Sequence, residues 1–131
     1  MYDIMSAMKT THDPAPRFSI HSRLRSFKHA FAGLAVLLRT QQNARVHTVA
    51  TAAVVAAGFA AGLSPAKWIA LVFAIAGVWV AEALNTALEF LADAAHPGYH
   101  PLVKKAKDLA AAAVLIAATA ATAVGIIVFA T

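Results

Sequence analysis

The chain has 131 residues, of which 60% are apolar and 13% charged, with a formal net charge of +5 and no cysteine. Soluble domains are about 45–50% apolar and about 25% charged, so this composition excludes an ordinary soluble domain and favours a membrane protein. The lack of cysteine excludes a disulfide framework, a thiol nucleophile and a cysteine-ligated metal site. Seven of the eleven lysines and arginines lie in residues 1–47. Membrane topology explains this basic segment without a nucleic-acid partner.

The chain begins with a polar stretch, residues 1–21, which we interpret as a flexible tail. From residue 22 to about 45, apolar side chains recur at helical spacing, with basic residues elsewhere on the helical wheel. The apolar positions are Leu24, Phe27, Phe31, Leu34 and Leu38. A basic amphipathic helix of this kind lies in the plane of the membrane interface or packs its apolar face on other protein.

Three apolar segments follow, and each is predicted to span the membrane. The first, about 46–63, is rich in alanine and valine and is near the lower length limit of about 17 residues. The turn GLSPAK (62–67) separates it from the second span, about 65–95. HPGYHP (96–101) ends the second span with two prolines and a glycine, and the third span covers about 102–130.

The distribution of lysine and arginine predicts how the chain is oriented. The N-terminal region carries seven of these residues, the 62–67 turn one and the 96–107 loop three. The N-terminus and the second loop are therefore expected to be cytoplasmic. Residues 22–131 should form one all-α, multi-pass membrane domain, in which small side chains allow close packing within or between subunits.

The stretch EALNTALEFLAD (82–93) is unusual because it places polar residues within a long apolar segment. Successive residues of an α-helix turn by about 100°, so Glu82, Asn85, Glu89 and Asp93 share one face. Glu82 would lie in the cytoplasmic third of the bilayer and Asp93 near its surface. Three interpretations are open: a structural network of buried polar groups, a proton or ion pathway, or a cation-dependent site with one carboxylate as a base.

A second polar stretch, GYHPLVKKAKD (98–108), should reach the same surface. Lysines beside metal-binding carboxylates are what a nucleotide polyphosphate requires. Topology alone would also explain these lysines, and Asp108 would suit the N-terminal end of a helix. The chain contains neither a Walker-type phosphate loop nor a protein-kinase catalytic loop, so a phosphotransferase here is not of a common soluble kind.

EALNTALEFLAD and YHPLVKKAKDLAAAAVL (99–115) resemble the motifs of the small prokaryotic membrane lipid kinases, the diacylglycerol and undecaprenol kinases. SFKHAFAGL (26–34) resembles the amphipathic helix of that family, and the resemblance covers about residues 22–130. It implies a homotrimer in the bacterial inner (plasma) membrane, with three spans and a surface helix per subunit and active sites shared between neighbouring subunits. The implied reaction is Mg²⁺-dependent transfer of the γ-phosphate of ATP to a long-chain lipid alcohol.

The resemblance also implies roles for individual residues. Glu82 matches the catalytic base that takes the proton of the lipid hydroxyl, and Glu89 matches a ligand of Mg²⁺ and ATP. The other positions implied to contact the nucleotide or shape its site are His29, Asn85, Asp93, Gly98, Tyr99, His100, Lys107 and Asp108.

One position departs from the family pattern. In RTQQNARVH (39–47), Gln41 stands where the family usually has a metal-binding glutamate, whereas Asn43, Arg45 and His47 fit the undecaprenol branch. A glutamine carbonyl can bind Mg²⁺, but without charge it should do so more weakly. The motifs favour undecaprenol over diacylglycerol as the acceptor, and Gln41 leaves open a catalytically weak member that acts as a structural membrane trimer.

Overall fold

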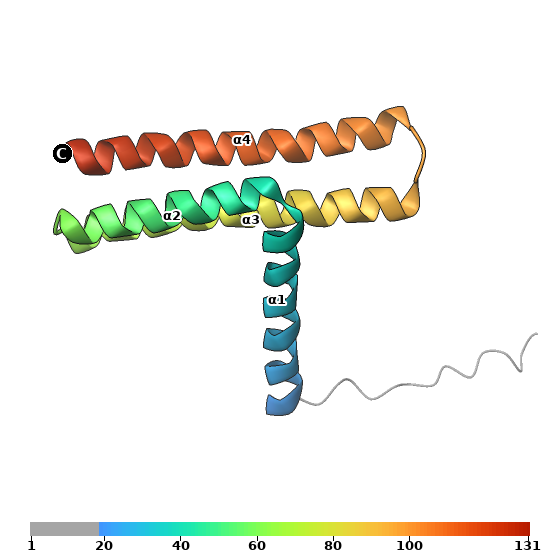
Figure 1. The fold of residues 1–131 in the computed structure, drawn as a ribbon, viewed down its shortest axis with the longest axis horizontal. Helices are drawn as coiled ribbons and strands as arrows, with labels where there is room; N and C mark the ends of the chain where they lie inside the picture. Colours follow the sequence, from blue (N-terminus) through green and yellow to red (C-terminus); the bar gives the residue numbers. More distant parts are fainter. Residues whose placement is uncertain (1–18) are drawn as a thin grey trace, which may run out of the picture. The chain divides into compact units, whose positions relative to one another are not determined.

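The computed structural model describes residues 19–131, which form α-helices and their connections (Figure 1). The helices are α1 (Ile20–Thr40), α2 (Gln42–Ala60), α3 (Pro65–Ala95) and α4 (Pro101–Ala130). The predicted all-α fold class is confirmed for this part of the chain. The predicted tail falls mostly outside the described residues, and α1 begins slightly before the expected start of the surface helix.

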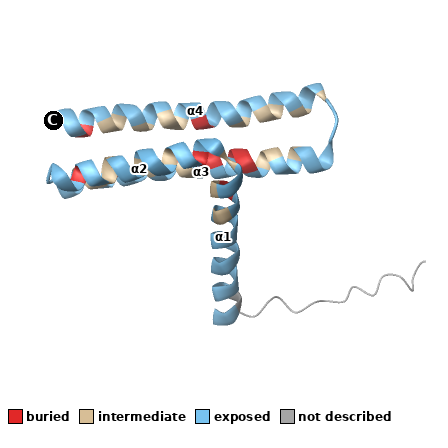
Figure 2. Ribbon diagram, viewed as in Figure 1, coloured by how far each residue is buried: buried red, intermediate tan, exposed pale blue. Residues whose placement is uncertain are grey.

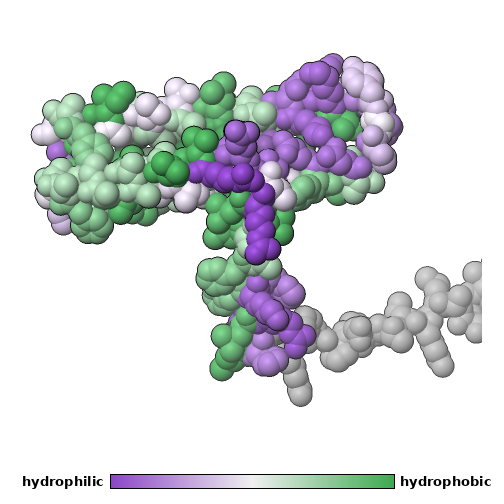
Figure 3. Space-filling view, viewed as in Figure 1, coloured by the Kyte–Doolittle hydropathy of each residue, from purple (hydrophilic) through white to green (hydrophobic). Residues whose placement is uncertain are grey.

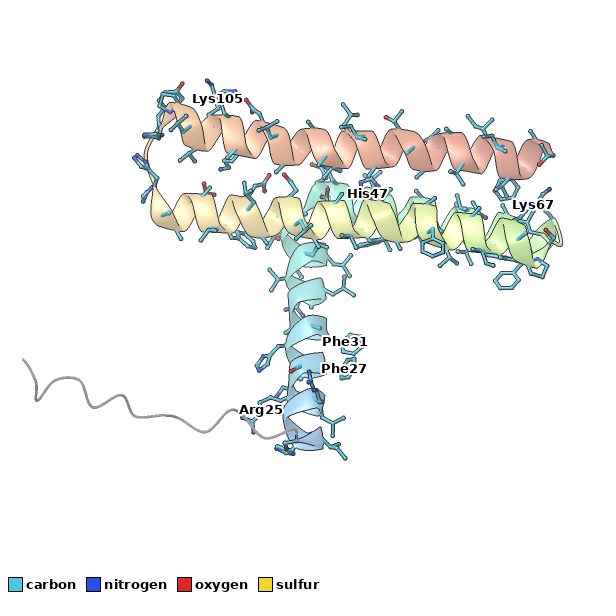
Figure 4. The ribbon with its side chains drawn as sticks, turned by 180° about the vertical axis from the view of Figure 1, so that it is seen from behind. Arg25, Phe27, Phe31, His47, Lys67 and Lys105 are labelled. Carbon is cyan, nitrogen blue, oxygen red and sulfur yellow. The ribbon has the colours of Figure 1, made fainter. Side chains whose placement is uncertain are left out.

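The chain divides into two units, Met1–Ala32 and Gly33–Thr131. In the first unit, the described residues are Ser19 and the beginning of α1, whose large apolar side chains are exposed. Figure 4 shows Phe27 and Phe31 on one side of this helix and Arg25 on the other. The segment is therefore helical and amphipathic, as its apolar spacing predicts.

The break between α1 and α2 falls at Gln41, whose backbone is extended (φ −102°, ψ 121°). The sequence predicts one helix to about residue 45, so the break comes earlier than expected, and no glycine or proline marks it. The Arg45 guanidinium donates to the carbonyl oxygens of Leu38 (3.2 Å) and Arg39 (2.8 Å). Arg45 thus satisfies backbone acceptors that the end of α1 leaves without helical partners.

The second unit is built on α3 and α4, which lie side by side and antiparallel, with α2 packed along α3 (Figure 1). The turn between α2 and α3 uses its glycine and its proline in the way that the GLSPAK sequence predicts. Gly62 takes a left-handed backbone conformation (φ 62°), which glycine adopts without strain, and Pro65 opens α3. Just before this turn, Gly58 packs against the ring of Trp68, where an added Cβ would lie 2.9 Å from a ring carbon.

Two of the helices among residues 19–131, α3 and α4, are long and apolar enough to cross a membrane. Each has at least thirty residues and is about 45 Å long, more than a hydrocarbon core of about 30 Å requires. The shorter α2 does not meet the same criterion, so its membrane crossing stays a prediction. Large apolar side chains are exposed along α3 and α4, which is the surface expected of helices that face lipid or other subunits.

Few side chains are buried in the second unit, and they form short patches rather than a continuous core (Figure 2). The apolar members are Leu37, Ala44, Leu71, Val78, Val114 and Val128. Figure 3 shows hydrophilic side chains gathered at the end where α3 connects to α4, and hydrophobic side chains towards the other end. The helix pair therefore has one polar and one apolar end.

Candidate functional site

The centre of the candidate site is a buried polar cluster on α3. Glu82, Asn85 and Thr86 are 1%, 7% and 4% exposed, and they are the buried polar residues of the described chain. Their spacing puts them on one side of the helix, next to each other around a single turn. Glu89 and Asp93 continue along this side, with Glu89 half-buried and Asp93 exposed. The polar face thus runs from the interior to the surface.

The cluster has acceptor atoms that no described side chain or backbone group satisfies. Both carboxylate oxygens of Glu82, Oδ1 of Asn85 and Oγ1 of Thr86 are buried without a hydrogen-bond partner. Burying a polar group without a partner is costly, and burying an ionised carboxylate without one is more costly still. Groups of this kind are retained where they bind a ligand or carry out chemistry.

Glu89 lies one turn beyond Asn85 towards the exposed end of the polar face, and both of its carboxylate oxygens accept hydrogen bonds. The Asn85 amide donates to Oε1 at 3.2 Å, and the Gln41 amide donates to Oε2 at 3.5 Å. Gln41 reaches Glu89 because the extended backbone at the α1–α2 break directs it towards α3. The structure therefore brings together the two residues that the sequence predicts as metal ligands, although they are 48 positions apart.

These residues fit a hard cation such as Mg²⁺ in the chemistry of their donors. Glu89 supplies a carboxylate, and Asn85 and Gln41 supply amide groups that can present oxygen instead of nitrogen after rotation. Among residues 19–131 there is no group of three His, Cys, Asp or Glu side chains placed to hold a metal. Mg²⁺ is commonly held by one or two carboxylates with phosphate oxygens and water completing its shell, so a bound nucleotide would supply what the protein lacks.

An ion pair joins the outer end of the polar face to α4. Lys107 Nζ donates to Asp93 Oδ1 at 2.7 Å, which brings together two residues predicted to contact the nucleotide. Asp108, predicted for the same role, instead pairs with Lys104 along the surface of α4. Lys104, Asp108 and Asp93 are exposed and Lys107 is partly exposed, so both pairs contribute little to stability and remain available to a charged ligand.

The loop before α4 holds two histidines whose rings lie 5.0 Å apart, His96 and His100. His100 caps α4, because its Nδ1 accepts from the backbone N–H of Leu102 at 3.2 Å. The carbonyl of Gly98 contacts His96 Nδ1 at 3.1 Å, while Tyr99 is 80% exposed. The predicted nucleotide-contacting stretch therefore includes one residue, His100, that shapes the helix start. His29 lies exposed on α1 in the first unit.

A cavity of about 550 Å³ opens between α2, α3 and α4, beside the buried cluster. Val78, one turn before Glu82, lines it from α3, and His47 and Thr51 line it from α2. The rest of the lining is apolar except for Thr122 on α4. Trp79 Nε1 donates to Thr51 Oγ1 at 3.2 Å and ties α2 to α3 beside this cavity.

Three features of the site were not predicted from sequence. The sequence contains no signal for the cavity, since alanine and valine are equally common where helices pack tightly. Thr86 directly follows Asn85 in the motif and could have been found by asking which neighbours share the Glu82 face. His47 fits the family pattern, but its location in the cavity lining depends on how α2 packs against α3.

Comparison with known proteins identifies the family. Residues 28–129 match the sequence profile of the family described as prokaryotic diacylglycerol kinase. The chain is 36% identical over 113 residues to a protein of Bacillus subtilis (strain 168) named undecaprenol kinase, covering 86% of this chain and 92% of that protein. It is 43% identical over 101 residues to a protein of Synechocystis sp. (strain ATCC 27184 / PCC 6803 / Kazusa) named diacylglycerol kinase, covering 76% of this chain but 58% of that longer protein. Since the profile match extends over most of the sequence, this chain belongs to the prokaryotic diacylglycerol kinase family of lipid kinases.

Proposed function

We propose that this protein is an integral-membrane kinase that transfers the γ-phosphate of ATP to the hydroxyl group of a long-chain lipid alcohol. The observation that carries the proposal is the environment of Glu82. Its carboxylate is buried, both of its oxygens lack a partner, and it lies between an apolar cavity and the Glu89 group. A base in this position can meet a lipid hydroxyl on one side and a nucleotide on the other.

In the proposed reaction, the Glu82 carboxylate accepts the proton of the lipid hydroxyl while the hydroxyl oxygen attacks the γ-phosphorus. The bond from that phosphorus to the bridging oxygen of ATP breaks, and ADP leaves with the electron pair. Glu89, with the amides of Asn85 and Gln41, would hold Mg²⁺, which when bound offsets phosphate charge. Lys107 contacts Asp93, about three turns from Glu82 along α3, where it can bind phosphate oxygens.

The apolar cavity supports a lipid as the acceptor. Its volume of about 550 Å³ is in the usual range for a ligand site, and its lining suits a hydrocarbon chain. We favour undecaprenol over diacylglycerol, because the NARVH and YHPL motifs fit the undecaprenol branch. The relative that this chain covers almost completely is also named undecaprenol kinase.

We further propose a homotrimer in the bacterial inner membrane, with α2 as a third span, a cytoplasmic N-terminus and active sites shared between subunits. The polar end of the helix pair supports this orientation, because it carries the lysines of the second loop. The unpartnered acceptors of the Glu82 cluster support a shared site, since a neighbouring subunit can supply groups that one chain lacks.

The test is a kinase assay on the purified protein in detergent micelles, with labelled ATP and Mg²⁺ and with undecaprenol or diacylglycerol as the acceptor. We expect label in the lipid fraction, more with undecaprenol, and none with Glu82→Gln. If wild-type protein labels neither lipid, the proposed function is wrong. If Glu82→Gln is as active as wild type, the role of Glu82 is wrong.

A catalytically weak structural trimer is a second candidate, favoured by the amide of Gln41 facing Glu89 in place of a second carboxylate. An inactive wild type that becomes active as Gln41→Glu would support it.

The proton pathway is not proposed. Between Lys67 and Glu82, α3 has no ionisable residue, and α4 has none after Asp108. No ionisable side chain of α3 or α4 therefore carries the row of carboxylates further towards the other end of these helices.

A further inference from the structure

The cavity between α2, α3 and α4 lies on the same side of α3 as the polar face. Leu71, Ile75 and Val78 line it from α3, and Glu82 follows Val78 at the same helical spacing. The apolar lining of the cavity therefore passes directly into the polar face. Glu82 is buried, and neither of its carboxylate oxygens has a hydrogen-bond partner among the described residues. A ligand that fills the cavity thus ends beside a polar group that lacks a partner.

The lining of the cavity offers few hydrogen-bonding groups to a ligand. Thr51 Oγ1 accepts from the Trp79 indole at 3.2 Å, and Thr122 Oγ1 donates to the carbonyl of Ala118 within α4 at 2.8 Å. Apart from His47, the remaining lining residues are apolar. Such a lining suits a hydrocarbon chain and gives a polar head group little to bind.

The α4 wall of the cavity has a glycine among small side chains. Ala118, Ala121 and Gly125 line the cavity at helical spacing, so they share one side of α4. A Cβ added at Gly125 would meet nothing within 4 Å. Because Gly125 belongs to the lining, this open space is part of the cavity.

Gly125 lies about two helical turns from the level of Glu82. The Asp93–Lys107 contact sets the register of the antiparallel helices α3 and α4. The same register puts Gly125 opposite Ile75, and both residues line the cavity. Ile75 precedes Glu82 by about two turns, or about 10 Å. An extended chain advances about 1.2 Å per bond, so about eight bonds separate a hydroxyl at Glu82 from the level of Gly125.

We infer that Gly125 is a specificity-determining residue: it leaves room in the cavity wall for the part of the acceptor chain that extends more than about eight bonds from the hydroxyl. A side chain at this position would fill that space and turn longer chains away from the cavity. The inference rests on the proposed function, in which the acceptor hydroxyl meets Glu82. It adds the position at which the protein distinguishes long acceptor chains from short ones.

The first experiment measures kcat/KM of full-length wild type and Gly125→Leu for geraniol, farnesol and undecaprenol, each at a defined mole fraction in the same micelles. The geraniol chain ends at about the level of Gly125, whereas the other two chains extend past it. The loss caused by Gly125→Leu should be about tenfold greater for farnesol and undecaprenol than for geraniol, because leucine displaces the longer chains from several close carbon contacts. Gly125→Ala adds one methyl group and should cause a smaller loss.

The matched control is Gly77→Leu, the same change at a glycine of α3 that lies outside the cavity lining and also has open space beside it. It should leave the preference among the three alcohols unchanged. Equal losses with all three alcohols in folded Gly125→Leu would overturn the inference, since that pattern is expected if a helix of a second copy fills the cavity. An unchanged preference in Gly125→Leu would overturn it as well. Gly125→Val replaces Gly125→Leu if the latter does not purify as a folded protein.

A second measurement needs no turnover, so it separates this inference from the proposed function. Trp79 bonds to Thr51 in the cavity wall, and in a Trp68→Phe background it is the only tryptophan of the chain. A long-chain alcohol brominated about eight to ten bonds from its hydroxyl, at the level of Gly125, should quench Trp79 fluorescence. Undecaprenol should relieve this quenching. In the same background, Gly125→Leu should remove the part of the quenching that undecaprenol relieves, and Gly77→Leu should retain it.

A phospholipid brominated at the same depth, at the same mole fraction, provides the comparison. Equal quenching by the phospholipid and the alcohol, with equal relief by undecaprenol, would identify an ordinary membrane lipid as the occupant and overturn the inference. If wild type phosphorylates no lipid but the quenching by the alcohol depends on residue 125, the proposed function fails and the chain site stands. If lipid is phosphorylated and the quenching does not depend on residue 125, the inference fails.

Discussion

Gln41, at the break between α1 and α2, donates a hydrogen bond to Glu89 on α3, across 48 positions of sequence. The contact puts an uncharged amide against the carboxylate that we propose as a Mg²⁺ ligand. A second carboxylate at this position would add charge to the site, and the affinity of oxygen-rich sites for hard cations increases with ligand charge.

Gln41→Glu should therefore tighten Mg²⁺ binding. We expect the Mg²⁺ concentration for half-maximal activity to fall about tenfold. In a chelator, the same variant should unfold at a lower temperature than wild type, because two carboxylates then repel each other without a cation. Gln42→Glu makes the same change at the exposed first residue of α2 and should alter neither quantity. Equal Mg²⁺ dependence in Gln41→Glu and wild type would contradict the proposed metal site.

Thr86→Val tests whether the unpartnered hydroxyl of the buried cluster has a functional role. Valine has nearly the same shape and removes an unsatisfied polar group, so the folded protein should become slightly more stable. If the hydroxyl contacts substrate, kcat should nevertheless fall by about tenfold or more. Thermal unfolding and steady-state kinetics on one preparation measure both effects.

The control for this change is Thr119→Val on α4, whose hydroxyl bonds to the Leu115 carbonyl within its own helix and is exposed. It should leave activity near the wild-type value. Full activity in Thr86→Val would show that the hydroxyl is a structural feature of the cluster and not part of the reaction.

Lys107→Gln should weaken nucleotide binding without unfolding the protein. Asp93 is exposed and Lys107 is partly exposed, so loss of their ion pair should change the unfolding temperature only slightly. Loss of a charge-assisted phosphate contact should raise KM for ATP about tenfold, with KM for the lipid unchanged. Lys105→Gln removes the same charge from an exposed position of α4 (Figure 4) and provides the comparison. Equal effects of the two changes would reveal a general charge effect instead of a specific contact.

Gly58→Ala tests the packing that joins the apolar ends of α2 and α3. The added methyl group would lie 2.9 Å from a ring carbon of Trp68 and 3.2 Å from Leu63, so the unfolding temperature should fall. Gly77→Ala makes the same change in α3 where nothing lies within 4 Å, and it should raise stability by up to about 1 kcal/mol through helix propensity. Destabilisation by Gly77→Ala would instead indicate that this face packs closely against another subunit.

Local sequence signals account for much of the fold. The GLSPAK turn, the HPGYHP loop and the helical spacing of the polar face each have a residue-level cause, and the helices begin and end near these signals. The α1–α2 break has no such signal, because Gln41 is surrounded by residues that a helix accepts. Its extended backbone accompanies a contact with Glu89 that is distant in sequence. The register that places His47 beside the cavity is likewise a property of packing, which a helical wheel does not contain.

The gradient of exposure along α3 has a consequence for how two immiscible substrates meet. Glu82 is 1% exposed, whereas the side chain of Asp93, three turns later on the same helix, is 67% exposed. A water-soluble phosphate donor can approach from the exposed end at Asp93, and a lipid alcohol can approach from the buried end at Glu82. The donor can therefore react without leaving water, and the alcohol without leaving the membrane. For a kinase built in this way, the rate depends on the surface density of the alcohol within the bilayer. Diluting the alcohol with inert lipid should slow the reaction even when its total amount in the sample is constant.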